Sequence, residues 1–184
     1  MSAKTYFGVA DVALVGVFCA LWAVLNLTLG PLSFSLLNLP VLHDFAAFFP
    51  LLIITWAIRR FGASSIVGII GSIIAIFLGG PPLIICFAAS AVIFDLLMSA
   101  NHHVVRVSIF SFTVVAISTM LSAYFAGVSI GIFFAPHQTL LETLQWAMTF
   151  WGGWHLVGGI VTLLITFPVI LALENRGVRK IMNH

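Results

Sequence analysis

Long apolar runs follow one another along this chain, and short polar or helix-breaking stretches separate them. The clearest run lies between Arg59-Arg60 and Gly79-Gly80-Pro81-Pro82, and residues 66–78 within it carry no ionisable side chain. An apolar helix of about 20 residues crosses the hydrocarbon core of a bilayer. The pattern predicts six membrane-spanning helices, at residues 9–29, 44–58, 63–78, 83–99, 104–126 and 150–173.

Glycine and proline set the predicted ends of these helices. Gly30-Pro31 is expected to stop the first span, and residues 31–40 to form a loop in the membrane interface or over the bundle. Thr139 and Glu142 have the spacing of a capping box, which predicts that a helix begins there. A break is expected at Gly152-Gly153 before the last span continues.

Composition gives the class of protein. Of the 184 residues, 62% are hydrophobic and 7% are charged, whereas soluble domains carry about 25% charged residues. The sequence therefore predicts an all-α integral membrane protein, a single transmembrane domain over residues 1–184, with no room for a soluble domain. The formal charge of +2 is too small to favour a nucleic acid as partner.

The basic residues predict the orientation in the membrane. With six spans, the N-terminus, loops 2–3 and 4–5 and the C-terminus share one side, and loops 1–2, 3–4 and 5–6 contain no lysine or arginine. All seven basic residues fall on that shared side: Lys4, Arg59, Arg60, Arg106, Arg176, Arg179 and Lys180. Cytoplasmic loops are enriched in such residues, so both termini are expected in the cytoplasm of a multi-pass cell-membrane protein.

Motifs of common catalysts are missing from the sequence. It contains no GxxxxGK[ST], HExxH, CxxC or GxSxG pattern, so we expect no enzyme activity, no cofactor and no metal site. If transport by this chain uses ATP, another chain must hydrolyse it. Cys19 and Cys86 lie in apolar runs and are expected to be buried as small apolar side chains.

Small residues recur at helical spacing in two spans. The first span has Ala13, Gly16 and Ala20, and the third has Gly68 and Ser72. Such faces let helices approach closely, within the bundle or against another membrane subunit. Both alternatives stay open for the third span. Docking is favoured for the first-span face, since it lies in the half nearer the cytoplasm.

One carboxylate falls inside a predicted span. Asp95 is costly to place in a membrane unless it is paired, and an ion pair with Arg59, Arg60 or Arg106 is expected. Contact with a partner protein and ion or proton handling are the alternatives.

Polar and aromatic side chains gather at the opposite, non-cytoplasmic ends of the spans. The predicted pocket residues are Asn26, His43, Trp151, Trp154 and His155. Uncharged polar groups beside aromatic rings predict a pocket for a small ring-bearing solute, and Asp44 or Glu142 would suit a cationic ring.

Other roles are open for these residues. Tryptophans at this level often anchor helices in the membrane interface. Glu142 has a role as a helix cap, and His155 would form a hydrogen bond between helices. Metal binding by His43 and His137 with His155 is a weaker alternative, because their spacing follows no known pattern.

The layout resembles the substrate-binding S-component of energy-coupling factor (ECF) vitamin transporters. The features that carry the resemblance are Gly16-xxx-Ala20, Pro40-Val-Leu-His43-Asp44, Ile58-Arg59-Arg60-Phe-Gly62-Ala63, Gly68-Ile-Ile-Gly71, Leu78-Gly79-Gly80-Pro81-Pro82, Gly158-Gly159 with Pro168, and the basic tail. The hairpin from Arg59 to Pro82 is most similar to S-components assigned to thiamine or its hydroxymethylpyrimidine precursor. Met1-Ser2-Ala3 lacks the Met-His start of the cobalt and nickel branch.

The resemblance implies a transport function in a prokaryotic plasma membrane. An S-component binds a vitamin in its outer half, under loops 1–2, 3–4 and 5–6. It associates with a transmembrane coupling protein and two ATPase subunits, and here the Ala13/Gly16/Ala20 face would meet the coupling protein. The alternative function is a non-catalytic structural subunit of a larger membrane enzyme complex. An intramembrane enzyme that uses His155 lacks a nucleophile.

Overall fold

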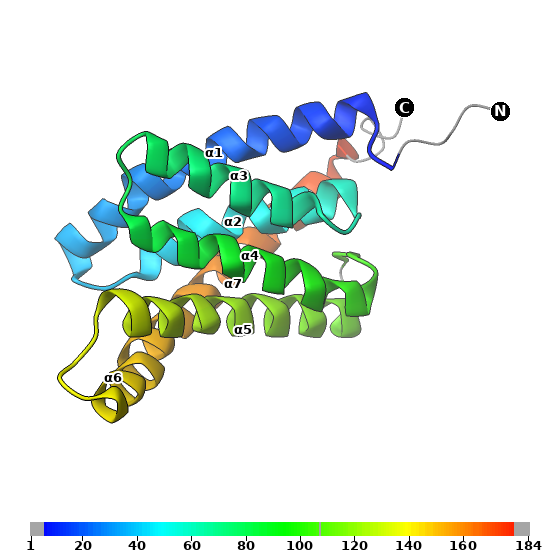
Figure 1. Cartoon of the computed structure of the whole chain (residues 1–184). Coiled ribbons are helices and arrows are strands. Elements are labelled where there is room, and N and C mark those ends of the chain that lie inside the picture. The colour runs from blue at the N-terminus through cyan, green and yellow to red at the C-terminus, as the bar shows by residue number, and fades with distance from the viewer. Residues whose placement is uncertain (1–5, 107, 179–184) are drawn as a thin grey trace.

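A computed structural model describes residues 6–106 and 108–178 of the chain. Every regular element in these residues is helical (Figure 1). The α-helices are α1 (Val9–Leu37), α2 (Val41–Ile58), α3 (Ala63–Phe77), α4 (Ile85–Met98), α5 (Ile109–Phe134), α6 (Leu140–Trp146) and α7 (Gly152–Asn175). The 3-10 turns η1 (Pro82–Ile84) and η2 (Ser99–Asn101) flank α4, and the π-helical turn η3 (Ala147–Trp151) joins α6 to α7. The predicted all-α class is confirmed for these residues.

Several helices have the length and composition of membrane spans. Five described segments are long and apolar enough to cross a membrane: Val9–Leu37, Val41–Ile58, Pro82–Asn101, Ile109–Phe134 and Leu140–Asn175. α3 has 15 residues, fewer than the roughly 20 of a typical span. The helices therefore indicate a membrane protein, in which α3 is a shorter member of the bundle.

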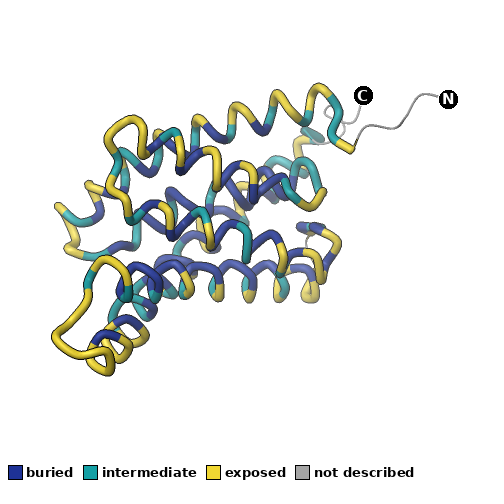
Figure 2. The backbone as a smooth tube through the Cα atoms, in the orientation of Figure 1, coloured by how far each residue is buried: buried dark blue, intermediate teal, exposed yellow. Residues whose placement is uncertain are grey.

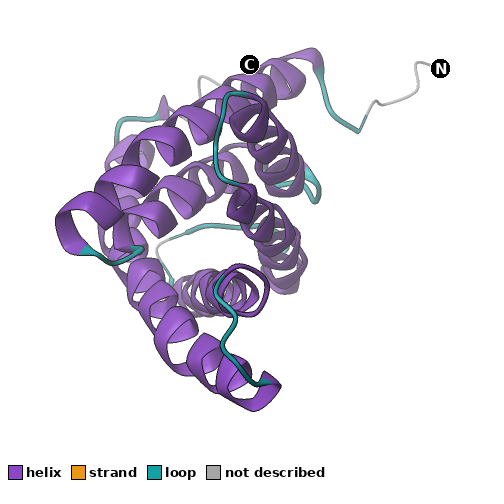
Figure 3. Cartoon of the chain, turned by 60° about the vertical axis from the view of Figure 1, so that its left-hand side comes forward, coloured by secondary structure: helices purple, strands orange, loops and turns teal. Residues whose placement is uncertain are grey.

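The six long helices form a closed ring. Its order is α1, α2, α7, α5, α4 and α3, and α3 packs against α1 again. The packing can be followed in Figure 3. α2 also contacts α3, α4 and α5, and 12 of its 18 residues are buried. α2 is thus the most enclosed helix, and a polar side chain on it is surrounded by the others.

The bundle is apolar outside and contains small hydroxyl side chains inside. Large aliphatic residues such as Val17 and Leu164 are more than half exposed, and exposed positions follow the outer sides of the helices (Figure 2). Inside, the hydroxyls of Thr119 and Thr162 each donate to a carbonyl of their own helix at 2.8 Å. These two buried hydroxyls are thus satisfied without water, and an apolar exterior suits a lipid solvent.

α1 is longer than the sequence predicts. The helix continues through Pro31 to Leu37, where a stop at Leu29 was expected, and only residues 38–40 connect it to α2. Proline is tolerated in membrane helices when neighbours satisfy the freed backbone groups. Here the Ser33 hydroxyl donates to the Leu39 carbonyl and accepts from the Leu42 amide, which ties the end of α1 to the start of α2.

α5 and the last helix also differ from the predicted segments 104–126 and 150–173. α5 begins at Ile109 and runs to Phe134, and α6, η3 and α7 follow one another without a break at Gly152-Gly153. Gly152 does not break the helix. It lets α7 approach α5 closely, since a Cβ on Gly152 would come within 2.6 Å of the Tyr124 ring. The predicted capping box at the start of α6 is confirmed, because Thr139 and Glu142 cap each other's backbone amides.

The small residues of α3 pack inside the bundle. A Cβ on Gly68 would lie 2.2 Å from the Cβ of Ala91 on α4, and one on Gly71 would lie 2.8 Å from the Trp22 ring on α1. These contacts fix α3 between α1 and α4. For the third span the structure therefore supports packing and not docking.

Gly68→Ala tests this close contact, with Gly16→Ala as the matched control. Both changes remove a helical glycine, but a Cβ on Gly16 meets no atom within 4 Å. Overpacking costs about 1–3 kcal/mol, so we expect Gly68→Ala to lower the thermal unfolding midpoint in detergent well below that of Gly16→Ala. Equal midpoints for the two variants would contradict the α3–α4 contact.

Candidate functional site

A cavity of about 110 Å³ lies at the end of the bundle opposite to the N-terminal end of α1. Helices α1 and α2 and the turn before α4 form its wall. The residues that line it are Asn26, Gly30, Pro31, Phe34, His43, Pro81 and Leu83. Two of the five predicted pocket residues, Asn26 and His43, are therefore part of this wall.

Asn26 and His43 are buried with free polar atoms. The Asn26 side-chain amide donates to the Trp22 carbonyl at 2.8 Å, which leaves its Oδ1 without a partner. The His43 ring lies against Gly30, where a Cβ would approach to 3.2 Å, and tilts over Phe87 at 4.6 Å between ring centroids. Neither His43 ring nitrogen has a hydrogen-bond partner.

Asp44 and His155 form a buried hydrogen bond between α2 and α7. Asp44 Oδ1 accepts from His155 Nδ1 at 2.8 Å, and both side chains are 0% exposed. Gly158 makes the contact geometrically feasible, since a Cβ there would lie 2.1 Å from Asp44 Oδ2. Asp44 Oδ2 and His155 Nε2 have no partner. His155 thus acts as the predicted bond between helices and also carries a free nitrogen.

The two predicted tryptophans have different surroundings. The Trp151 ring lies 6.3 Å from the His155 ring and 6.4 Å from the Phe34 ring, and its buried Nε1 has no partner. The π-helical turn η3 sets its position, and π-helical turns in α-helices are frequent at functional sites. Both Trp151 and Trp154 are partly buried, and neither is among the residues of the cavity wall.

Free polar atoms concentrate around this end of the bundle. The described residues contain nine buried side-chain polar atoms without a hydrogen-bond partner. Six of them belong to this group: Asn26 Oδ1, His43 Nδ1 and Nε2, Asp44 Oδ2, Trp151 Nε1 and His155 Nε2. Each such atom costs about 1–3 kcal/mol when it stays unsatisfied. The concentration is typical of a binding site for a polar solute.

The metal-binding alternative does not fit this arrangement. His137 lies outside the group, on the exposed connection between α5 and α6, with its ring 5.4 Å from that of Trp146. Within the described ranges, no three His, Cys, Asp or Glu side chains are placed to hold a metal ion. His43, His137 and His155 are therefore not brought together.

The prediction that Asp95 forms an ion pair with an arginine is wrong. Asp95 accepts hydrogen bonds from the Gly62 amide at 2.8 Å and from the Ser65 hydroxyl at 2.6 Å, and its other oxygen bonds His103 at 2.8 Å. It thus caps the N-terminal end of α3, where free backbone amides favour an anion. Gly62 and Ser65 were hard to predict as partners, because they lie 33 and 30 residues from Asp95 and only the fold brings them together.

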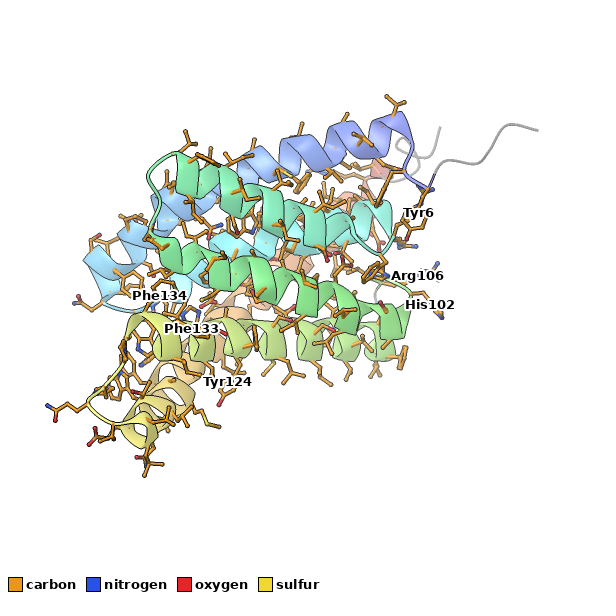
Figure 4. The ribbon with its side chains drawn as sticks, in the orientation of Figure 1. Tyr6, His102, Arg106, Tyr124, Phe133 and Phe134 are labelled. Carbon is orange, nitrogen blue, oxygen red and sulfur yellow. The ribbon has the colours of Figure 1, made fainter. Side chains whose placement is uncertain are left out.

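The arginines instead close the opposite end of the bundle. Arg59 lies 3.8 Å from Glu174 at the end of α7, and Arg60 pairs with Asp11 near the start of α1 at 2.6 Å. Figure 4 shows Arg106 at the same end of the bundle as Tyr6. Lys4, Arg179 and Lys180 lie outside the described residues. The described basic residues and the cavity are therefore at opposite ends.

The predicted docking face is on the outside of α1. Ala13, Gly16 and Ala20 are all exposed, and a Cβ on Gly16 would meet no atom within 4 Å. These small residues contribute no packing to the described bundle, in contrast to the row on α3.

Several wall residues were missed from sequence. Gly30, Phe34 and Leu83 carry no chemical pattern that marks a pocket, and only the fold brings them to His43. Pro81 belongs to the predicted turn over the pocket, and Asp44 was considered only as a partner for a cationic ring.

Comparison with protein-family models, with curated proteins and with solved structures gives no match.

Asp44→Ala tests the buried bond across α2 and α7. Removing one partner leaves a buried polar group without its hydrogen bond, which costs about 1–3 kcal/mol, so we expect a clear loss in the free energy of unfolding. The double variant Asp44→Ala/His155→Ala should lose less than the sum of the two single variants.

Asp11→Ala is the control for Asp44→Ala, because Asp11 also bonds a side chain of another helix or turn but is partly exposed. Exposed pairs contribute about 0–1 kcal/mol. If the losses in the free energy of unfolding add up in the double variant, or if Asp11→Ala and Asp44→Ala lose equally, the bond between Asp44 and His155 does not stabilise the bundle more than an exposed pair does.

Proposed function

We propose that this chain is the substrate-binding S-component of an ECF-type importer. It captures a small vitamin or vitamin precursor, with a thiamine-like solute favoured, in the outer half of its bundle. The observation that carries the proposal is the cavity with Asn26 and His43 in its wall, both buried with free polar atoms. A solute that fills it would lie against these two side chains, whose free polar atoms cost folding energy while they stay unsatisfied.

The polarity of the bundle supports an outward-facing site. The cavity lies beside the connections α1–α2 and α3–α4, which contain no basic residue, and the described arginines lie at the other end. By the positive-inside rule the arginine end is cytoplasmic. The site then opens to the outside of a prokaryotic plasma membrane, and both termini are in the cytoplasm.

Uptake by this chain requires partners. The sequence has no nucleotide-binding motif, so two ATPase subunits supply the energy through a transmembrane coupling protein. The exposed Ala13/Gly16/Ala20 face lies in the half of α1 nearer the arginine end. Small residues there let a partner helix approach closely, so we assign the coupling protein to this face. The chain itself needs no catalytic group.

The second candidate is a structural subunit of a membrane enzyme complex. It accounts equally well for the exposed small residues on α1. It gives no reason for six unpartnered polar atoms inside the bundle, because a purely structural interior is normally satisfied. Co-purification with an oxidoreductase, with no response to any solute, would favour this candidate.

Solute binding by the purified chain tests the proposal. We expect one member of a vitamin panel (thiamine, its pyrimidine precursor, riboflavin, biotin, pantothenate and pyridoxine) to raise the unfolding temperature in a saturable way. Asn26→Ala and His43→Ala should each lower its affinity at least about tenfold, since a lost hydrogen bond of about 1.4 kcal/mol has this effect.

Thr28→Ala and His137→Ala are the matched controls, because both residues are exposed and lie outside the cavity wall. They should leave the affinity unchanged. A panel without any response, or equal losses in the controls, would argue against this function.

Gly16→Leu and Ala20→Leu test the docking face. Bulky side chains there should prevent close approach of the coupling protein, and reduce its co-purification with the chain several-fold while solute binding persists. Thr113→Leu is the control: Thr113 is exposed on α5, on the opposite side of the ring from α1. Unchanged co-purification in both α1 variants would exclude this face as the docking site.

A further inference from the structure

We infer that a second pocket, on α6 and η3, binds the ammonium group of an organic cation, such as that of choline or ethanolamine. The residues that line this pocket are His137, Glu142, Gln145, Trp146 and Thr149. None of them lines the cavity of the proposed function, so the inference does not depend on that function. Two sources carry the same chemical group: the headgroup of a membrane lipid and a free solute.

The helix that carries the pocket is longer than the apolar core of a membrane is thick. α6, η3 and α7 run together over Leu140–Asn175, which is 36 residues and about 54 Å at 1.5 Å per residue. The hydrocarbon core measures about 30 Å. Glu174 in α7 lies 3.8 Å from Arg59 at the arginine end, so the surplus length falls at the other end. There α6 projects from the ring of helices (Figure 1), which places it at the level of the lipid headgroups.

α6 has the two sides that suit this level of a membrane. Leu140, Leu141 and Leu144 are exposed, and their spacing places them on one side of the helix. The pocket residues Glu142 and Trp146 are four positions apart and share another side. The apolar side suits acyl chains, while the pocket side meets headgroups and water. A lipid headgroup is therefore a suitable source of the ligand.

The charge of the pocket selects a cation. Glu142 is the one acidic residue that lines it, and no lysine or arginine does so. Its Oε2 accepts from the Thr139 amide at 3.2 Å, and it forms no salt bridge with another residue in the described ranges. The side chain is exposed, so its carboxylate reaches a ligand in the pocket. An anionic ligand finds no positively charged lysine or arginine there.

Trp146 adds an aromatic surface to this carboxylate. Its ring stacks on that of Phe150 with 4.4 Å between centroids, and the His137 ring lies 5.4 Å away. These contacts hold the Trp146 ring in place, while the residue stays 40% exposed. Tryptophan attracts cations best among the aromatic side chains, and quaternary ammonium groups are recognised in this way. The volume of about 410 Å³ is that of a small-molecule site.

Titration of the purified full chain with choline tests the inference, in a maltoside detergent whose headgroup carries no ammonium group. The methyl NMR signal of choline reports binding. Dimethylbutanol is the matched neutral compound, because a carbon atom replaces the charged nitrogen of choline. We expect choline to bind in a saturable way and at least about fivefold more tightly than dimethylbutanol, since only the charged compound is attracted by Glu142 and Trp146.

Two variants test the residues of the pocket. Glu142→Gln removes the charge and keeps the helix start, because glutamine also completes a capping box. This variant and Trp146→Leu should each lower the affinity for choline at least about threefold. Asp11→Asn and Phe133→Leu are the matched controls, since they make the same kinds of exchange outside the pocket. They should leave choline binding unchanged.

Nanodiscs of two neutral lipids distinguish the sources of the ligand. Phosphatidylcholine carries the ammonium group, and digalactosyldiacylglycerol does not. If a headgroup fills the pocket, choline binds at least about fivefold more weakly in phosphatidylcholine, because the lipid competes with it. Equal affinity in the two lipids identifies a free solute as the ligand.

The inference is overturned if choline does not bind, or binds no more tightly than dimethylbutanol. An unchanged affinity in Glu142→Gln would overturn it as well. These outcomes leave the proposed function standing, because Asn26 and His43 belong to the other cavity. A vitamin panel without any response would, in turn, argue against the proposed function and leave the choline site standing.

Discussion

The hydrogen bond between Asp44 and His155 is the interaction on which the arrangement of the cavity end depends. It joins α2, the most enclosed helix, to its neighbour α7, and both side chains are fully buried. In a bilayer core no water can replace a lost partner, so this bond constrains the relative position of the two helices. It also orients His155, and His43, one residue before Asp44, lies against Gly30 at the cavity wall.

Close packing at small residues allows polar groups to be buried at this depth. Gly158 leaves room for the Asp44 carboxylate, and Gly127 leaves room for the His155 ring, since a Cβ on Gly127 would lie 2.6 Å from that ring. Interior hydroxyls such as that of Thr162 are satisfied within their own helix. The bundle can therefore be tightly packed elsewhere, while unpartnered polar atoms remain concentrated beside one cavity.

The two ends of the bundle differ in how their polar groups are used. At one end Asp95, Arg59 and Arg60 are bonded to loop amides, to His103 or to acidic residues. At the other end the polar side chains are buried and keep free atoms. Of these three residues, Arg59 keeps one unpartnered atom, Nε, and the other bonds suit this end to a structural role. An end with free polar groups is suited to bind a solute, which is the basis of the function we propose.

The sequence alone determined the all-α class, the membrane character and the helix start at Thr139, because hydrophobic pattern and capping are local properties. It also pointed to Asn26, His43 and His155, since polar residues in apolar segments are conspicuous. Only the tertiary structure decided that α1 continues past Pro31, that Asp95 bonds His103 and not an arginine, and that Phe34, Pro81 and Leu83 face the cavity. The cavity wall depends on contacts between residues far apart in the chain. The Ser33–Leu39 and Asp95–His103 bonds join residues 6 and 8 positions apart, but they depend on the geometry of the turns between them. The hydrophobic pattern carries no information about either kind of contact.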